Sequence, residues 1–312
     1  MIVIDQASTQ ALMPFEDLVP ALRSAFQADI TVPLRHNHTM QCGDEQGIIL
    51  IMPAWDAKQY MGIKTVNIFP ANRDKGLPGL HSTYLLFDGT SGQPLANIDG
   101  NTITSRRTAA ASALAADYLA RKDASRLLVV GSGQVAAYLP AAYATVRELS
   151  EVMVWNINPD SAQRLVQQLQ EQGFKARHIE DLDQGISQAD IISCATLSEQ
   201  PLIKGCQLRA GQHLDLIGSF TPKMIESDAA CFAGNAVFVD TDEAPMKAGD
   251  LLEAFKAGSL QPEDIQANLF DLCAGKHAGR SSESEITVFK AVGNALEDLA
   301  AAVLVYQRYL DQ

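Results

Sequence analysis

The sequence predicts an α/β protein in which a doubly wound parallel sheet is inserted into a second, α+β domain. Two patterns support this prediction. Through the middle of the chain, short apolar runs alternate with helical segments, which is typical of parallel strands covered by helices on both faces. Before residue 104, strand-like runs follow one another without helices between them, which favours an antiparallel or mixed sheet. The chain has 312 residues, which leaves room for two domains of about 150 residues each.

The N-terminal part begins with one predicted helix and continues as strands. Apolar residues with helical spacing run from Pro14 to Ala28, and Pro14 suits a first turn. We expect strands next at residues 33–42, 47–55 and 60–69. The turn-forming residues at 88–92 predict a hairpin between strands at 82–87 and 94–99.

The pattern changes at Thr104, where an Ala-rich, helix-favouring segment begins. A strand is expected at 126–130, followed by a helix that ends near Glu148. Beyond it we expect a helix at 159–173 and strands at 151–155, 174–179, 190–194, 213–218 and 236–240. Residues 287–309 have the pattern of one long amphipathic helix, which could return to pack on the N-terminal part. The sequence therefore predicts one domain at 116–286 and another made of 1–115 plus 287–312.

The composition excludes several classes of partner. Asp and Glu outnumber Lys and Arg by 37 to 24, which gives a formal net charge of −13. Such a surface repels nucleic acid and anionic membrane surfaces, and no basic patch offsets it. No apolar segment reaches the ~18 residues of a membrane span, and no signal peptide pattern is present. The five scattered cysteines favour reduced thiols in a cytoplasmic protein and no metal site.

The sequence GSGQVA at residues 131–136 matches the G-x-G-x-x-G/A fingerprint of dinucleotide-binding loops. Gly131 permits a tight turn, Gly133 lets a pyrophosphate approach the backbone, and Ala136 lets helix and sheet pack closely. The N-terminus of the following helix offers N–H groups to phosphates. A predicted strand before the loop and a predicted helix after it support this interpretation over an ordinary glycine turn. The middle domain is therefore predicted to be a Rossmann domain.

The end of the second strand of that domain bears on the choice of cofactor. NAD enzymes carry an Asp or Glu there, about 20 residues after the loop, which accepts a hydrogen bond from the ribose 2′-hydroxyl. Here the position holds Asn156. A neutral side chain does not repel a 2′-phosphate, so the sequence favours NADPH, with NADH possible. No arginine lies at that strand end, and Arg164 lies further on, in the predicted helix.

Four segments together resemble the ornithine cyclodeaminase/mu-crystallin family. They are MGIKTVNIFPAN at 61–72, the block from LLFDGT to YLAR at 85–121, VVGSGQVA at 129–136, and ITVFKAVGNALEDLAAAVLVY at 286–306. The resemblance covers nearly the whole chain. It implies a homodimer, with the N-terminal sheet and C-terminal helix forming the substrate-binding and dimerisation domain, and an active site in the interdomain cleft. Members include ornithine cyclodeaminases, alanine dehydrogenases, ketimine reductases and NADPH-binding mu-crystallins, so the family alone does not fix the reaction.

The resemblance also implies roles for three residues. Lys64 matches the family's active-site lysine, Arg107 the arginine at the cofactor and substrate cleft, and Arg35 the arginine that holds the substrate carboxylate in ketimine reductases. These are the candidate catalytic residues. The candidate cofactor contacts are Gly131, Gly133, Gln134, Val135, Ala136, Asn156, Thr83, Arg107 and Thr108.

Two positions depart from the cyclodeaminase pattern. Cyclodeaminases carry a Glu shortly before a Met-Pro dipeptide, and Leu50 stands at that position here. They also carry an Asp two residues after the glycine of a late strand, where this chain has Phe220. Neither side chain can pair with a second amine or move its proton. We therefore expect ornithine cyclodeaminase chemistry to be lost.

The remaining pattern favours reduction of a small cyclic imino acid. Δ1-pyrroline-2-carboxylate and Δ1-piperideine-2-carboxylate would yield L-proline and L-pipecolate. Arg35 would hold the carboxylate as a bidentate fork, Lys64 would donate a proton near the imine nitrogen, and NAD(P)H would deliver hydride to C2. His36 is a weak candidate, because strand alternation places it opposite Arg35. Thr83 could touch the nicotinamide ribose or only pack across strands.

Several alternatives stay open. Asp99 could be the ion partner of Arg106 and Arg107, and Asp240 could face a ligand or cap the next helix. His213 is expected to be a core histidine. Three rival functions are an ornithine cyclodeaminase that recycles NAD, an alanine dehydrogenase acting on pyruvate and ammonia, and a non-catalytic binder of NADPH and a hydrophobic carboxylate, similar to a crystallin.

Overall fold

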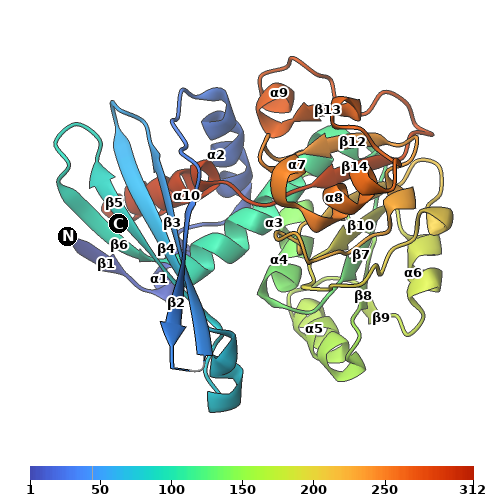
Figure 1. Cartoon of the computed structure of the whole chain (residues 1–312), viewed down its shortest axis with the longest axis horizontal. Helices are drawn as coiled ribbons and strands as arrows, with labels where there is room; N and C mark the ends of the chain where they lie inside the picture. Colours follow the sequence, from blue (N-terminus) through green and yellow to red (C-terminus); the bar gives the residue numbers. More distant parts are fainter. Residues whose placement is uncertain (44) are drawn as a thin grey trace. The chain divides into compact units, whose positions relative to one another are not determined.

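The computed structural model (Figure 1) describes residues 1–43 and 45–312, with side chains for all of these except residues 73 and 74. The chain folds as two compact units. Unit 1 consists of Met1–Arg107 and Asn294–Gln312, and unit 2 of Thr108–Gly293. Unit 2 is therefore an insertion within the sequence of unit 1.

Unit 1 is built on a six-stranded sheet in the order β1-β6-β5-β4-β3-β2. The prediction of an antiparallel or mixed sheet is confirmed, because β2 to β6 pair antiparallel while β1 joins β6 in parallel. Helix α10 packs against α2 and strands β3, β4 and β5. The elements are β1 (Ile2–Ile4), α1 (Gln6–Ala11), α2 (Phe15–Gln27), β2 (His36–Cys42), β3 (Glu45–Trp55), β4 (Tyr60–Ile68), a 3₁₀ helix (Pro70–Lys75), β5 (Leu80–Asp88), β6 (Pro94–Asp99), α3 (Gly100–Leu119), which continues into unit 2, and α10 (Ala295–Leu310).

Unit 2 contains an eight-stranded sheet in the order β13-β12-β14-β11-β10-β7-β8-β9, and all its neighbouring strands are parallel. This confirms the predicted α/β class. The elements are β7 (Arg126–Val130), α4 (Gln134–Tyr143), β8 (Glu151–Trp155), α5 (Pro159–Glu171), β9 (Ala176–His178), α6 (Leu182–Gln188), β10 (Ile191–Cys194), β11 (His213–Leu216), β12 (Ala236–Val239), α7 (Ala244–Lys247), α8 (Gly249–Lys256), β13 (Ile265–Asn268), α9 (Leu269–Cys273) and β14 (Thr287–Lys290), with 3₁₀ helices at Gly205–Gln207, Ala229–Cys231 and Pro262–Asp264.

Three details of the predicted elements are wrong or missing. Residues 287–309 do not form one helix, because Thr287–Lys290 is strand β14, buried between β11 and β12, and Gly293 turns the chain at φ +77°. Helix α4 ends at Tyr143, where the Thr145 hydroxyl donates to the Ala142 carbonyl that the helix would otherwise use. Strand β1 and helix α1 are too short to show a periodicity.

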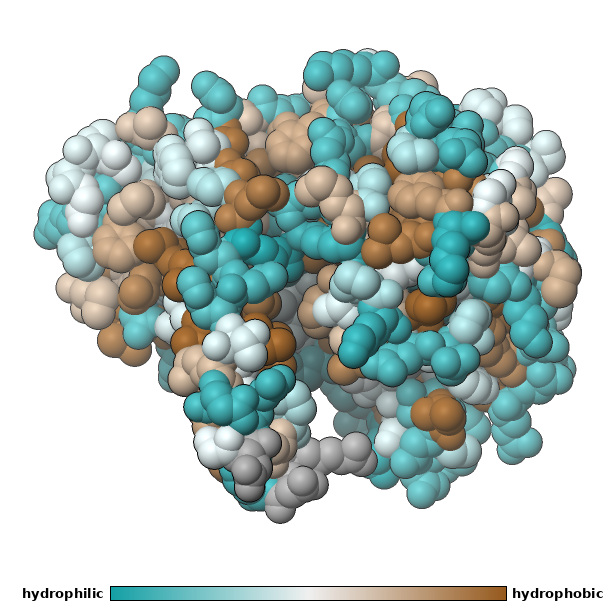
Figure 2. All heavy atoms as spheres, viewed as in Figure 1, coloured by the Kyte–Doolittle hydropathy of each residue, from teal (hydrophilic) through white to brown (hydrophobic). Residues whose placement is uncertain are grey.

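On the face drawn in Figure 2, hydrophilic residues cover much of unit 2, with isolated apolar residues between them. Among the helices that the structure describes, none has a stretch both long and apolar enough to span a bilayer.

Candidate active site

Lys64 lies in the middle of β4 and is almost completely buried, with 1% of its side chain exposed. Its ammonium lies 2.6 Å from Oδ2 of Asp298, which is itself fully buried in the first turn of α10. A buried lysine is costly unless an anion compensates its charge. The sheet and the C-terminal helix thus meet at an ion pair closed off from water.

Arg107, in α3, binds the same turn of α10 with two nitrogens. Its Nε donates to Oδ1 of Asp298 at 2.8 Å, and its Nη1 donates to Oε2 of Glu297 at 2.7 Å. Glu297 is also fully buried. Lys64, Arg107, Glu297 and Asp298 form a group of two positive and two negative charges, which we call the buried quartet.

The quartet tunes the proton affinity of its members. Burial lowers the pKa of Lys64 to about 8, although Asp298 opposes the shift. Burial alone would raise the pKa of Asp298, but the charges of Lys64 and Arg107 hold it below its usual value. The pKa of Arg107 is raised, because Asp298 and Glu297 outweigh the effect of burial. Near neutral pH, Lys64 is therefore a cation that can release its proton at little cost.

Arg35 precedes β2 and is partly buried. Its positive charge also lowers the pKa of Lys64, so the two side chains lie within electrostatic range of each other. The structure thus brings together Arg35, Lys64 and Arg107, the three predicted catalytic residues, in unit 1. An arginine at this place has the fork of donors that suits a carboxylate ligand.

Tyr84 adds a neutral hydroxyl next to the quartet. It pairs with Lys64 across β4 and β5, and it is fully buried. Burial and the negative charge of Asp298 raise the pKa of Tyr84 well above its usual value. Within the described part of the chain its hydroxyl has no hydrogen-bond partner. A Cβ on Gly62 would overlap that hydroxyl, so Gly62 provides the space in which it lies.

The GSGQVA loop connects β7 to α4. Gly131 adopts φ +116°, and a Cβ there would lie 2.6 Å from the Ala195 carbonyl oxygen. Gly133 is the N-cap of α4, is exposed, and has open space where a Cβ would be. The N-cap makes no side-chain cap hydrogen bond, and the first turn of α4, which includes Val135, has the geometry of a phosphate-binding helix N-terminus. Ala136 is fully buried. These features fit a dinucleotide pyrophosphate.

The other predicted cofactor contacts have local partners. Asn156, just after β8, donates from Nδ2 to the Asn158 carbonyl at 3.1 Å. Thr83 in β5 donates to Oδ1 of Asn97 at 2.5 Å. Thr108 is partly buried in α3, next to Arg107. A cofactor role for these three residues stays a prediction.

The suggestion that Asp99 is the ion partner of the two arginines is wrong, and so is the suggestion that Asp240 caps the next helix. Within the described residues, Asp99 accepts from the backbone N–H of Thr102 and forms no ion pair with either arginine, and Arg107 is paired with Glu297 and Asp298. Arg106 instead donates to the Met13 carbonyl and lies over the ring of Phe15. Both arginines are buried.

Asp240 does not cap helix α7. Its carboxylate accepts from the backbone N–H groups of Thr241, Val292 and Gly293. His213 is a core residue as expected, and its Nδ1 lies 2.9 Å from the Thr287 hydroxyl. His36 and His38 are exposed and stacked on each other.

Sequence reasoning missed Glu297, Asp298 and Tyr84. Acidic residues in the first turn of a helix are usually read as partners of the helix dipole. The available signal was their position: they precede a run of apolar residues in a helix that must pack on the sheet. A buried anion on such a helix requires a buried cation elsewhere.

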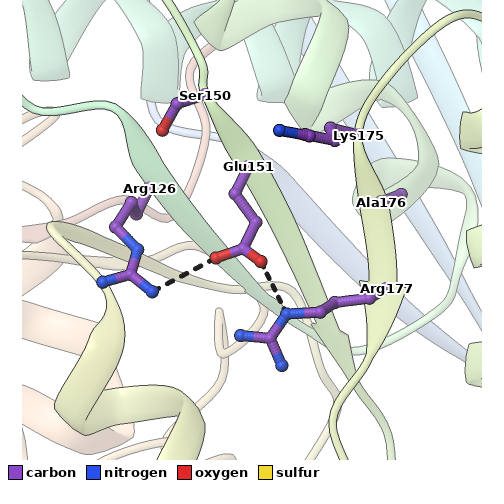
Figure 3. A pocket seen from close by; sticks show the side chains of 6 residues that line it. All are labelled: Arg126, Ser150, Glu151, Lys175, Ala176 and Arg177. Carbon is purple, nitrogen blue, oxygen red and sulfur yellow. Dashed lines mark hydrogen bonds and ion pairs between the residues drawn. The ribbon is translucent and has the colours of Figure 1, made fainter.

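A pocket of about 320 Å³ lies at another place in unit 2, at the edge where β7 and β8 begin. Figure 3 shows Glu151 between Arg126 and Arg177, at 3.3 and 2.6 Å. None of the predicted site residues lines this pocket. Its acidic group is already paired with two cations, so we do not assign it to the site.

The ornithine cyclodeaminase/mu-crystallin family model matches residues 2–312. A Δ1-pyrroline-2-carboxylate reductase of Paracoccus denitrificans is 37% identical over 292 residues, which cover 93% of this chain and 91% of that relative. The solved structure of Thermococcus litoralis Δ1-pyrroline-2-carboxylate reductase with NADH and L-proline is 31% identical, with a TM-score of 0.93 and coverage of 100% and 98%. An archaeal alanine dehydrogenase dimer with bound NAD is 29% identical, with a TM-score of 0.92 and coverage of 100% and 96%. The chain therefore belongs to the ornithine cyclodeaminase/mu-crystallin family.

Proposed function

We propose that this chain reduces the C=N bond of a small cyclic imino acid, with NADPH as the preferred donor and NADH as a possible one. The substrates would be Δ1-pyrroline-2-carboxylate and Δ1-piperideine-2-carboxylate, and the products L-proline and L-pipecolate. The chain is an NAD(P)H-dependent oxidoreductase acting on C=N, in line with its relatives. The observation that carries the reaction type is the buried Lys64, whose ammonium lies 2.6 Å from Asp298 and whose pKa of about 8 suits a proton donor, within electrostatic range of Arg35.

The proposed reaction has three parts: binding of the substrate carboxylate, protonation of the imine nitrogen and transfer of hydride to C2. Arg35 would bind the substrate carboxylate through two parallel hydrogen bonds. Lys64 would donate its proton to the imine nitrogen, because a protonated imine accepts hydride more readily than a neutral one. The bound nicotinamide supplies the hydride that reaches C2. Substrate, proton and hydride together give the saturated ring amine with no other reactant.

The quartet prepares Lys64 for this step. Asp298 lies 2.6 Å from Nζ and fixes the direction of the ammonium. Arg107 holds the other carboxylate oxygen and so prevents Asp298 from turning toward the substrate. Once Lys64 has lost its proton, the remaining charges are one cation and two anions, which favours taking up a proton again.

The dinucleotide would bind through the GSGQVA loop of unit 2. Gly133 leaves its backbone open to the pyrophosphate, and the uncapped N-terminus of α4 favours negative charge. Asn156 lies at the end of β8, where it carries no charge that would repel a 2′-phosphate. The preference for NADPH rests on that residue.

Ornithine cyclodeaminase activity is not supported, since no carboxylate stands at the two positions that the reaction needs. Leu50 is a residue of β3, and Phe220 packs against the apolar core of unit 2. A second amine would meet hydrocarbon there instead of a proton acceptor. Alanine dehydrogenase activity is a second candidate, favoured by the similarity to the archaeal enzyme. It would use the same arginine and lysine on the imine of pyruvate.

A homodimer and a cytoplasmic location belong to the same proposal. The archaeal alanine dehydrogenase is described as a dimer. Unit 1 would supply the dimer contacts and hold the imino acid, while unit 2 would hold the dinucleotide. Five free cysteines suit a reducing compartment.

One substrate panel tests the proposal. The purified chain is given NADPH or NADH with Δ1-pyrroline-2-carboxylate, Δ1-piperideine-2-carboxylate or pyruvate plus ammonia, and the loss of nicotinamide absorbance is followed. L-ornithine is assayed in parallel for ammonia release. We expect kcat/KM to be highest for a cyclic imino acid with NADPH. Faster turnover of pyruvate plus ammonia would select the alanine dehydrogenase, and ammonia from ornithine would overturn the proposal.

A further inference from the structure

Unit 2 contains a second cluster of buried charges that the proposed reaction does not use. Lys290, at the end of β14, lies 2.9 Å from Oδ2 of Asp250 and 2.5 Å from the hydroxyl of Ser219. Oε2 of Glu226 lies 3.9 Å from the same ammonium. All four side chains are buried, with at most 1% of any of them exposed. Burying charged groups is costly, so the interactions that compensate these charges must be identified.

Glu226 connects the ends of two neighbouring strands. One of its oxygens accepts from the backbone N–H of Thr196 at 2.7 Å and from the Thr196 hydroxyl at 2.8 Å. The other accepts from the backbone N–H groups of Gly218 at 2.8 Å and Ser219 at 3.1 Å. Thr196 follows β10 and Gly218 follows β11, which pair in parallel. A single carboxylate therefore fixes both chain segments at the carboxyl edge of the sheet.

The same segments support the GSGQVA loop. A Cβ on Gly131 would lie 2.6 Å from the Ala195 carbonyl oxygen and 3.3 Å from the Thr196 side chain. A Cβ on Gly218 would overlap the Thr196 backbone. The segment Ala195–Thr196 therefore lies close to both Gly131 and Gly218, and its position bears on the start of the loop. In open parallel sheets, ligands bind at this edge.

Asp250 and Lys290 hold Glu226 in place. Oδ1 of Asp250 accepts from the backbone N–H of Glu226 at 2.7 Å and of Ser227 at 2.9 Å. Lys290 neutralises part of the local negative charge. Burial raises the pKa of Glu226 to about 7 even though Lys290 opposes that shift. Without Lys290, the carboxylate would be harder to keep ionised.

We propose that Glu226 is a positioning residue for the dinucleotide. It fixes the position of the GSGQVA loop by holding Thr196 and Gly218 against it, and Asp250 and Lys290 hold Glu226 in place. The inference rests on the proposed function only in taking a nicotinamide dinucleotide as the ligand. Glu226 acts through the backbone of its neighbours, so its loss should weaken dinucleotide binding more than it slows the reaction of the filled site.

The test is the affinity of the full-length Glu226→Gln variant for NADPH, measured by isothermal titration calorimetry. An amide offers one acceptor oxygen where the carboxylate uses two, so one strand end loses its support. We expect the NADPH Kd to rise about tenfold or more. The KM for NADPH should rise with it, while kcat at saturating NADPH stays within about twofold of wild type.

Asp215→Asn is the matched control. Asp215 is a fully buried carboxylate of the neighbouring strand β11, but within the described residues its hydrogen bonds, including those from Tyr143 and Ser193, come from side chains and not from the backbone. We expect this variant to lose stability while its NADPH Kd stays within about twofold of wild type. An equal rise in both variants would show general loosening of unit 2 and would overturn the proposal.

Ser219→Ala is a second variant for the same NADPH titration, and it tests the proposal if Glu226→Gln does not fold. It removes only the hydroxyl that bonds Lys290 and Asp250, and we expect a rise in NADPH Kd of about threefold or more. An unchanged Kd in the folded variants would overturn the inference. A wild-type chain that binds NADPH but reduces no imino acid would overturn the proposed function and leave this result standing.

Discussion

At the scale of single residues, the chemistry of unit 1 depends on charges that water does not reach. Asp298 serves two cations, Lys64 at 2.6 Å and Arg107 at 2.8 Å. Removing one member of such a group leaves an uncompensated buried charge, which costs about 3–5 kcal/mol. Each of these residues therefore contributes to folding as well as to the proposed reaction, and experiments must separate the two.

For Lys64, the pH dependence of kcat separates its contribution to the reaction from its contribution to folding. The pKa of Lys64 is about 8, and the proton donor is its charged form. We expect kcat to be constant below this value and to fall about tenfold per pH unit above it. In Asp298→Asn the pull that raises the pKa is lost, so the fall should begin at lower pH.

Glu297→Gln is the control for that shift, because Glu297 forms an ion pair with Arg107, whereas the ion pair of Lys64 is with Asp298. The pH at which kcat falls should be the same in this variant as in wild type. The measurement is kcat at saturating substrate across the pH range, on protein shown to be folded by circular dichroism. A profile of Asp298→Asn identical to wild type would remove Asp298 from the control of Lys64.

Arg35→Met should weaken binding of the substrate and leave binding of the cofactor unchanged. Methionine keeps much of the length of the side chain but cannot bind a carboxylate, so we expect the KM for the imino acid to rise on the order of 100-fold. The KM for NADPH should stay within about twofold. Steady-state kinetics with each substrate varied in turn measures both, and equal rises would place Arg35 outside the substrate site.

Gly133→Val tests the phosphate loop. Open space surrounds the position of its Cβ, so the fold should tolerate the change, while a branched side chain would occupy the place of the pyrophosphate. We expect NADPH affinity to fall on the order of 100-fold or more with the melting temperature unchanged. Gly131→Ala is the contrast: it should lower the melting temperature, because that residue has φ +116° and no space for a Cβ. Retained affinity in Gly133→Val would contradict the assignment of the loop.

Some site residues could be predicted from local sequence patterns, and others could not. The loop at 131–136 follows from local rules, since glycine spacing and a strand-to-helix context specify a phosphate site. Lys64, Arg35 and Arg107 came only from the family resemblance, because a lone lysine in a strand or an arginine in a helix has no local signature. Asp298 was missed, since its partner Arg107 is 191 residues away in the sequence.

At the scale of elements, buried context outweighs periodicity. The segment Thr287–Lys290 continues the amphipathic pattern of α10, yet it forms a strand because it inserts between β11 and β12. Conversely, the hairpin at residues 88–92 was predictable because Asp88 and Gly92 set its geometry locally: the Asp88 carboxylate accepts from Thr90 and Ser91, and Gly92 adopts φ +72°. Local turns are readable from the sequence, whereas strands that pair with distant partners are not.

Strands β4 and β5 give a prediction at this scale. Gly62→Ala places a methyl group where the hydroxyl of the fully buried Tyr84 lies, so the tyrosine or the strand must shift. We expect the free energy of unfolding to fall on the order of 1–3 kcal/mol in urea titrations. Gly79→Ala is the control, since its Cβ would meet only the Phe69 carbonyl oxygen at 3.7 Å. Equal stability of the two variants would show that the hydroxyl can move aside.

At the scale of the whole molecule, unit 1 is discontinuous in sequence. Its sheet comes from the first part of the chain, but Glu297 and Asp298 come from the last part. Truncation before Asn294 removes both anions of the quartet together with the helix that packs on β3, β4 and β5. We expect the truncated chain to lose the cooperative unfolding transition of unit 1, as measured by calorimetry and hydrogen exchange. A truncated chain that kept protection in β4 would show that the sheet is stable without α10.

The distance along the chain between Arg107 and Asp298 also has a consequence for synthesis. A ribosome adding about 5–20 residues per second makes the intervening 191 residues in roughly 10–40 s. Throughout that interval the nascent N-terminal segment holds two cations whose anions have not yet been translated. The sheet can close over Lys64 only after α10 has left the exit tunnel, so until then the apolar face of the early strands stays in water or with a chaperone.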